Sequence, residues 1–322
     1  MHSLHRIPIR TLSVFALVAA LTCGAFLVTA DADDAKAASG PQMFDDAVSA
    51  AKALVEAVGK NDTAALRALF GPGSEGYILD GSDPVVSKER KQFAEAAKKK
   101  ARLDDNEDGS KTLVIGDKDW PLPFPLRTKD GKFWWDGPAG QEEMRMRRIG
   151  RNELRVIDIM KIYIEAQVEY AGQDRDGDEV REYAQRIRST PGHKDGLYWP
   201  TEEDEPQSPL GPLVASWREH LGAGQGDGGK KVPFGGYYYR VLHGQGSAAP
   251  GGRHSYMING DMIAGFALVA YPADYGQSGI MSFLVSHHGK VYERDLGRCT
   301  AQCVKQMIGF NPTQGWAVVT EE

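Results

Sequence analysis

The sequence predicts a protein of the α+β class, with helices and antiparallel sheets in two successive domains. The prediction rests on two observations along the 322 residues. Segments with the helical period of 3.6 residues come first and are followed by short apolar runs between turn residues, and the same order then occurs a second time. Because helices and strands are grouped rather than alternating one by one, we expect antiparallel sheets rather than βαβ units.

Residues 1–30 have the pattern of a secretory signal peptide. Arg6 and Arg10 precede the apolar run TLSVFALVAALTCGAFLVTA, which the polar DADDAKAASG follows. Small residues before Asp31 and Asp33 fit a cleavage site, so we expect the mature chain to begin there and to be periplasmic or secreted. A retained membrane anchor is the alternative. No later run approaches the length of a membrane span, so we expect no transmembrane span in the mature chain.

Residues 31–42 are predicted to be a disordered linker, and residues 43–138 the first domain. The stretch DDAVSAAKALVEAVG has its apolar residues on one helical face, and Asn61 or Asp62 is expected to cap a second helix. A third helix is predicted over residues 86–102. The runs KTLVIG, PFPLRT and KFWWD lie between turn signals and indicate a small antiparallel sheet.

Residues 139–322 are predicted to form the second domain. A long helix is expected from Pro138 to Ala171, with a break at Gly150 as one alternative. A Gly/Pro-rich insertion follows over residues 189–235, and then GGYYYRVL, HSYMIN, MIAGFALVAYP, GIMSFLVS and KVYERDL indicate an antiparallel meander. The predicted apolar stripe of the long helix consists of Ile157, Met160, Ile164, Val168 and Ala171.

Long motifs suggest a family. RRIGRNELRVIDIMKIYIEAQVEYAGQDRDGD, STPGHKDGLYWP and GFALVAYPADYGQSGIMSFLVSHHGKVYERDLG together resemble a bacterial family of exported proteins known as domain of unknown function 2950, over about residues 40–320. This resemblance implies secretion and a shared structure, but no activity. Residues 152–171 with the following meander are similar to the globular part of type IV pilins and pseudopilins. The first domain resembles NTF2-like and cystatin-like folds, which implies a cone of helices and sheet.

The stretch YAGQDRDGDEVREYAQRI has aspartates at positions one, three and five of the calcium-loop pattern D-x-[DN]-x-[DN]-G-x5-E. Glu179 stands where the pattern has its turn glycine, and Gln185 where it has a bidentate glutamate. A standard EF-hand is therefore not expected. The sequence leaves open a Ca²⁺ site of another geometry or a solvated acidic turn. The candidate ligands are Asp174, Asp176, Asp178 and Glu182.

Cys299 and Cys303 are the two cysteines beyond the predicted signal peptide. On a regular helix the i, i+4 spacing directs the side chains poorly for bonding, so a disulfide requires Cys299 at a helix start. The sequence leaves open whether the pair is bonded. A candidate binding surface consists of the aromatic residues Tyr198, Trp199 and Tyr238. In a strand Tyr238 points away from the face of its two tyrosine neighbours, so at least one of the three should be exposed.

Charge and motifs exclude several function classes. The net charge is −6 without a basic cluster, which argues against nucleic acid as a partner. No nucleophile elbow and no P-loop occur, so we expect no cofactor other than Ca²⁺. We therefore expect an exported, soluble, non-enzymatic protein that binds another envelope protein or the cell surface. The alternative is a secreted hydrolase that acts on cell-wall or extracellular polymer in an inter-domain cleft, because catalytic residues distant in sequence can meet in a fold.

Overall fold

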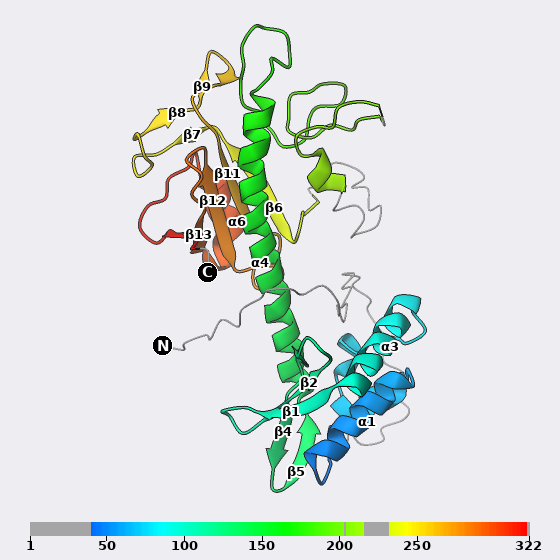
Figure 1. Ribbon diagram of the computed structural model, residues 1–322. Coiled ribbons are helices and arrows are strands. Elements are labelled where there is room, and N and C mark those ends of the chain that lie inside the picture. Colours follow the sequence, from blue (N-terminus) through cyan, green and yellow to red (C-terminus); the bar gives the residue numbers. More distant parts are fainter. Residues whose placement is uncertain (1–39, 203, 216–231, 321–322) are drawn as a thin grey trace, which may run out of the picture. The chain divides into compact units, whose positions relative to one another are not determined.

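The computed structural model describes residues 40–202, 204–215 and 232–320 (Figure 1). The predicted signal peptide and most of the predicted linker lie outside these residues. The chain divides into two compact units, Met1–Arg145 and Met146–Glu322. Both contain helices and antiparallel strands, so the predicted α+β class is confirmed.

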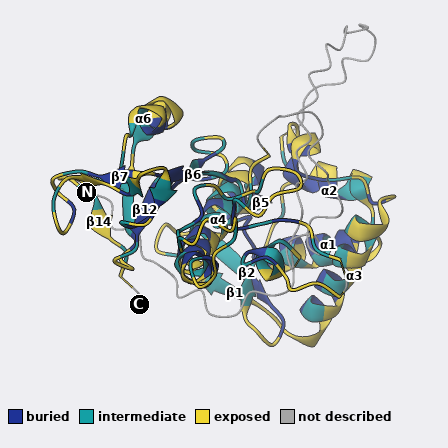
Figure 2. Cartoon of the chain, turned by 90° about the horizontal axis from the view of Figure 1, so that it is seen from above, coloured by how far each residue is buried: buried dark blue, intermediate teal, exposed yellow. Residues whose placement is uncertain are grey.

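Unit 1 begins with three helices that aspartates cap. These are α1 (Ala47–Gly59), α2 (Thr63–Phe70) and α3 (Pro84–Lys99), with the 3-10 helix η1 (Ser74–Gly76) after α2. The side chains of Asp46, Asp62 and Asp83 each accept a backbone N–H of the first helical turn. Figure 2 shows buried and exposed residues on both α1 and α3, as expected for helices that pack on a core with one face.

The sheet of unit 1 is antiparallel and has the order β1-β2-β4-β5, with β3 paired to β2. Its strands are β1 (Ala101–Asp105), β2 (Lys111–Ile115), β3 (Trp120–Pro121), β4 (Leu126–Lys129) and β5 (Lys132–Trp135). The third helix therefore ends before the predicted residue 102, because residues 101–105 pair with β2. The sheet and helices enclose a core that contains Leu54, Phe93, Phe124 and Trp135.

A single helix of 34 residues, α4 (Gly137–Tyr170), runs without a break at Gly150. Its buried side beyond residue 150 agrees only in part with the predicted stripe. Met160 is buried and Ile157 and Ile164 pack against the core, but Val168 is 61% exposed. The residues that are at most 2% exposed are Val156, Met160, Tyr163, Gln167 and Tyr170. The predicted stripe was misplaced because it left out the tyrosines and the polar Gln167. None of the helices in the described residues combines the length and apolar character that a membrane span needs.

Unit 2 is built on an antiparallel sheet of order β14-β13-β12-β11-β6. Its strands are β6 (Tyr237–Leu242), β11 (Ala267–Pro272), β12 (Met281–Ser286), β13 (Tyr292–Asp295) and β14 (Ala317–Val318). Two short pairs stand beside it, β7 (Gly244–Gln245) with β8 (His254–Ser255), and β9 (Met257–Ile258) with β10 (Asp261–Met262). The 3-10 helix η2 (Gly297–Cys299) leads into α6 (Thr300–Gln306).

Helices cover both faces of this sheet (Figure 1). On the α4 side, Glu153 accepts the backbone N–H of Met281 at 2.9 Å and lies 3.5 Å from the Tyr237 hydroxyl. On the α6 side, Arg240 donates to the carbonyl of Val304 at 2.6 Å. Tyr237 and Arg240 are three residues apart on β6 and so point to opposite faces. The strand thus contributes a contact to each helix.

Candidate functional site

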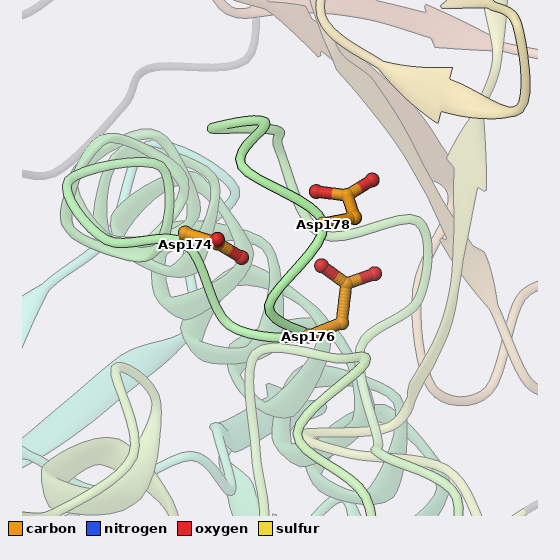
Figure 3. A group of neighbouring side chains, drawn as sticks. All are labelled: Asp174, Asp176 and Asp178. Atoms are coloured by element: carbon orange, nitrogen blue, oxygen red, sulfur yellow. The ribbon is translucent and has the colours of Figure 1, made fainter.

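Three carboxylates converge in the turn that follows α4. Asp174, Asp176 and Asp178 each place one oxygen within 4.8 Å of those of the other two, and all three residues are exposed (Figure 3). Among the described residues, this is the one group of three or more His, Cys, Asp or Glu side chains with such spacing. We call Asp174–Asp178 the acidic loop.

Side-chain hydrogen bonds to the backbone fold the acidic loop. Asp174 accepts the N–H of Gly177 at 2.7 Å and that of Glu179 at 2.9 Å, while Asp178 accepts the N–H of Val180 at 2.8 Å. Gly177 and Glu179 both have positive φ, 83° and 69°. This conformation costs a non-glycine residue about 1–2 kcal/mol. The left-handed turn that a calcium loop reserves for glycine is therefore formed here by Glu179.

Hydrogen bonds, desolvation and repulsion shift the pKa values of Asp174 and Asp176 in opposite directions. The backbone hydrogen bonds from Gly177 and Glu179 lower the pKa of Asp174. Partial desolvation, followed by the charges of Asp178 and Asp174, raises the pKa of Asp176. The neighbouring Arg175 does not form an ion pair with the aspartates, since its guanidinium lies over the Trp199 ring at 5.3 Å.

Glu182, the fourth predicted ligand, does not join the three aspartates. Its Oε2 instead accepts the backbone N–H of Met262 at 3.0 Å and the side-chain N–H of Gln185 at 3.2 Å. Gln185 also donates to the carbonyl of Gly260 at 2.7 Å. These bonds attach the segment after the acidic loop to the β9–β10 hairpin. Beside them, Ile258 and Ile263 are 45% and 41% exposed.

The three aromatic residues predicted as a binding surface do not form one. Trp199 lies in the core of unit 2 and is 6% exposed, because Arg175 and the core cluster cover its ring. Tyr198 and Tyr238 are half-buried, and the ring of Tyr238 contacts that of Tyr271 at a tilt of 48°, with centroids 5.7 Å apart. The expectation that at least one of Tyr237, Tyr238 and Tyr239 is exposed was wrong, since Tyr237 is fully buried and Tyr238 and Tyr239 are half-buried.

The two cysteines meet at the start of α6. Cys299 is the last residue of η2 and directly precedes the helix, which is the position that a bond to Cys303 requires. The Sγ atoms lie 3.0 Å apart. Cys299 is exposed and Cys303 is half-buried, and the hydrogen bond with Cys299 and partial burial raise the pKa of Cys303.

Residues 41–319 match the model of a family described as "Protein of unknown function (DUF2950)". The chain belongs to the DUF2950 family. The match covers the acidic loop, the hairpin and both cysteines of this DUF2950 protein. No curated protein and no solved structure was found to match it.

Sequence reasoning missed Gln167, which connects α4 of this DUF2950 protein to the segment that follows the acidic loop. Gln167 is 0% exposed. It accepts the N–H of Ala184 at 2.8 Å and donates to the carbonyl of Ala184 and to the Tyr163 hydroxyl, both at 2.9 Å. The side chain thus pairs with the backbone of the segment beyond the acidic loop. The available signal was a lone polar residue between the apolar positions of a helix.

Arg90 was also missed, and it lies in the core of unit 1. It is 4% exposed and donates to Asn61 at 2.8 Å, Thr63 at 3.0 Å and the carbonyl of Leu79 at 2.7 Å. Burial lowers its pKa. With apolar residues such as Phe93 it lines a cavity of about 60 Å³. These bonds tie the loop before α3 to the corner between α1 and α2, which is a structural role.

Proposed function

We propose that this DUF2950 protein is an exported, non-enzymatic binding module, and that Ca²⁺ bound by the acidic loop organises its docking surface. The proposal rests on one observation, the approach of Asp174, Asp176 and Asp178 to within 4.8 Å, with no ion-paired cation among the described residues. Carboxylate oxygens are the ligands that Ca²⁺ prefers, and main-chain carbonyls and water complete its shell of 6–8 ligands.

The docking surface that we propose consists of Ile258 and Ile263 with the acidic loop. Exposed apolar side chains beside charged ones are typical of protein–protein contacts. Binding of Ca²⁺ would remove the repulsion among the three aspartates and hold the backbone up to Val180. Glu182 and Gln185 follow Val180 closely in the sequence and are hydrogen-bonded to the β9–β10 hairpin. Ordering the acidic loop would therefore also help to order the hairpin.

The partner that we propose is another envelope protein with an apolar surface that receives the two isoleucines. Interfaces of this kind usually have apolar residues at the centre and polar residues at the rim. The hydrolase alternative stays a prediction. No observation in the described part of the chain favours it, so we do not propose it.

Calcium binding is tested by melting residues 31–322 in Ca²⁺ and in chelator. A site that binds the folded state alone adds about 2.7 kcal/mol to the free energy of unfolding at 100-fold excess over its Kd. We expect unit 2 to melt higher in Ca²⁺, and we expect Asp176→Asn to remove the increase. Asp117→Asn, an exposed aspartate in unit 1, should keep it. An equal melting temperature in both buffers would contradict the calcium site.

Partner binding is tested by photo-crosslinking in cells from a reactive residue placed at position 258. We expect one reproducible protein adduct, and we expect it to weaken when Asp176→Asn is added. The matched control has the reactive residue at Val85, which is 59% exposed in unit 1. Adducts that are equal at both positions would reject the docking surface. That result would leave the melting experiment unaffected, so the two parts of the proposal fail separately.

A further inference from the structure

The cysteine pair has the accessibility and spacing of a redox site. We propose that Cys299 and Cys303 form a reversible disulfide by exchange with small disulfide oxidants, of which oxidised glutathione is the probe. The Sγ atoms are 3.0 Å apart, and Cys299 is exposed to reagents in solution. This inference depends neither on the acidic loop nor on the docking surface.

The backbone around the pair is fixed at both ends of α6. At the start of the helix, the hydroxyl of the buried Thr300 donates to the carbonyl of Gly297 at 2.5 Å. At its end, Arg240 donates to the carbonyls of Val304 at 2.6 Å and Met307 at 2.8 Å. Val304 is 1% exposed and lies in the core of unit 2. The two thiols are therefore held near each other by contacts that do not involve sulfur.

The different exposure of the two thiols assigns their order of reaction. Cys299, the exposed thiol, loses its proton and attacks one sulfur of the oxidant, which forms a mixed disulfide and releases one glutathione thiolate. Cys303, once deprotonated, attacks the Sγ of Cys299, closes the protein disulfide and releases the second thiolate. The protein loses two electrons and two protons, and the disulfide of the oxidant becomes two molecules of thiol.

Intact-mass measurement after alkylation tests this exchange. The full chain is used with Cys23→Ser, which removes the remaining cysteine. The reduced protein should take up two alkyl groups. After oxidised glutathione it should take up none and have no bound glutathione, and dithiothreitol should restore both thiols. Two alkylatable thiols after oxidation, or two bound glutathiones, would overturn the proposal.

Single-cysteine variants test the assigned order. In Cys303→Ser, Cys299 should react and retain one glutathione, because no second thiol can displace it. In Cys299→Ser, the half-buried Cys303 should react several-fold more slowly. Equal rates for the two variants would overturn the assigned order, and disulfide-linked dimers of the two-cysteine protein would overturn the internal bond. Both variants should keep the melting temperature of the reduced protein, which shows that they fold.

Discussion

The buried side-chain amide of Gln167 pairs with the N–H and the carbonyl of Ala184, as a neighbouring strand would. Replacement by leucine, which has a similar size, would leave the buried N–H and carbonyl of Ala184 without partners. A buried unsatisfied group costs about 1–3 kcal/mol, so we expect Gln167→Leu to lower the free energy of unfolding of unit 2 by about 3 kcal/mol. Urea unfolding measures the change. Glu169→Leu, at an exposed position of the same helix, should change it by under about 0.5 kcal/mol.

In the proposed calcium site, Asp176 should make binding depend on pH. Its pKa is raised in the folded loop, so the folded state holds the proton more firmly than the unfolded state does. The ionised loop therefore loses stability as pH rises through this raised pKa, and a bound Ca²⁺ would compete with the proton for the same oxygen. We expect the stabilisation by Ca²⁺ to fade on acidification while ordinary aspartates are still ionised.

The pH dependence is measured by repeating the melts in Ca²⁺ and in chelator from neutral pH downward. The difference between the two melting temperatures should already decrease at a pH above 3.8, the ordinary pKa of an aspartate. A difference that stays constant down to that pH would contradict the role of Asp176 as a ligand.

Two glycines of α4 should respond to alanine in opposite directions. A Cβ at Gly140 would lie 2.0 Å from the ring of the buried Phe124, whereas one at Gly150 would meet nothing within 4 Å. Alanine gains up to about 1 kcal/mol over glycine inside a helix, but overpacking a core costs about 1–3 kcal/mol. We expect Gly140→Ala to lower the free energy of unfolding and Gly150→Ala to raise it. Urea unfolding of both variants checks the signs, and equal signs would refute this argument.

Among the helices and strands, the sequence predicted best those that depend on residues close together in the chain. Asp62 was among the two predicted caps of α2, and the main strands of the second sheet were located by their apolar runs. Tertiary contacts decided the rest. Strand β1 was missed because ARLDD has no apolar run: its first two residues were predicted as helix, and Asp104 and Asp105 as part of a turn. The predicted stripe of α4 was misplaced because Gln167 is buried only through its bonds to Ala184.

The candidate site was predictable in composition but not in geometry. Spacing alone located the three aspartates, yet it could not show that Glu182 bonds to Met262 across 80 residues of chain. It also could not show that Glu179 adopts the left-handed conformation, because that conformation follows from the bonds of Asp174 to the loop backbone.

The described residues form two hydrophobic cores that share no residue. We therefore expect calorimetry to resolve two unfolding transitions. Gly140→Ala should lower one of them, and Gln167→Leu should lower the other, since these residues belong to different units. If both variants lowered one common transition by similar amounts, the two units would unfold as one cooperative body.

Each core is formed by one uninterrupted stretch of chain, and the two stretches follow one another in the sequence. The two units can therefore begin to fold at different times. As the chain is synthesised from its N-terminus, every residue of the first core has been made by Trp135, before any residue of the second core. Unit 1 can therefore fold while the rest is still being delivered. Unit 2 cannot complete its sheet until nearly the whole chain has been made, because β14 at residues 317–318 forms one edge of that sheet.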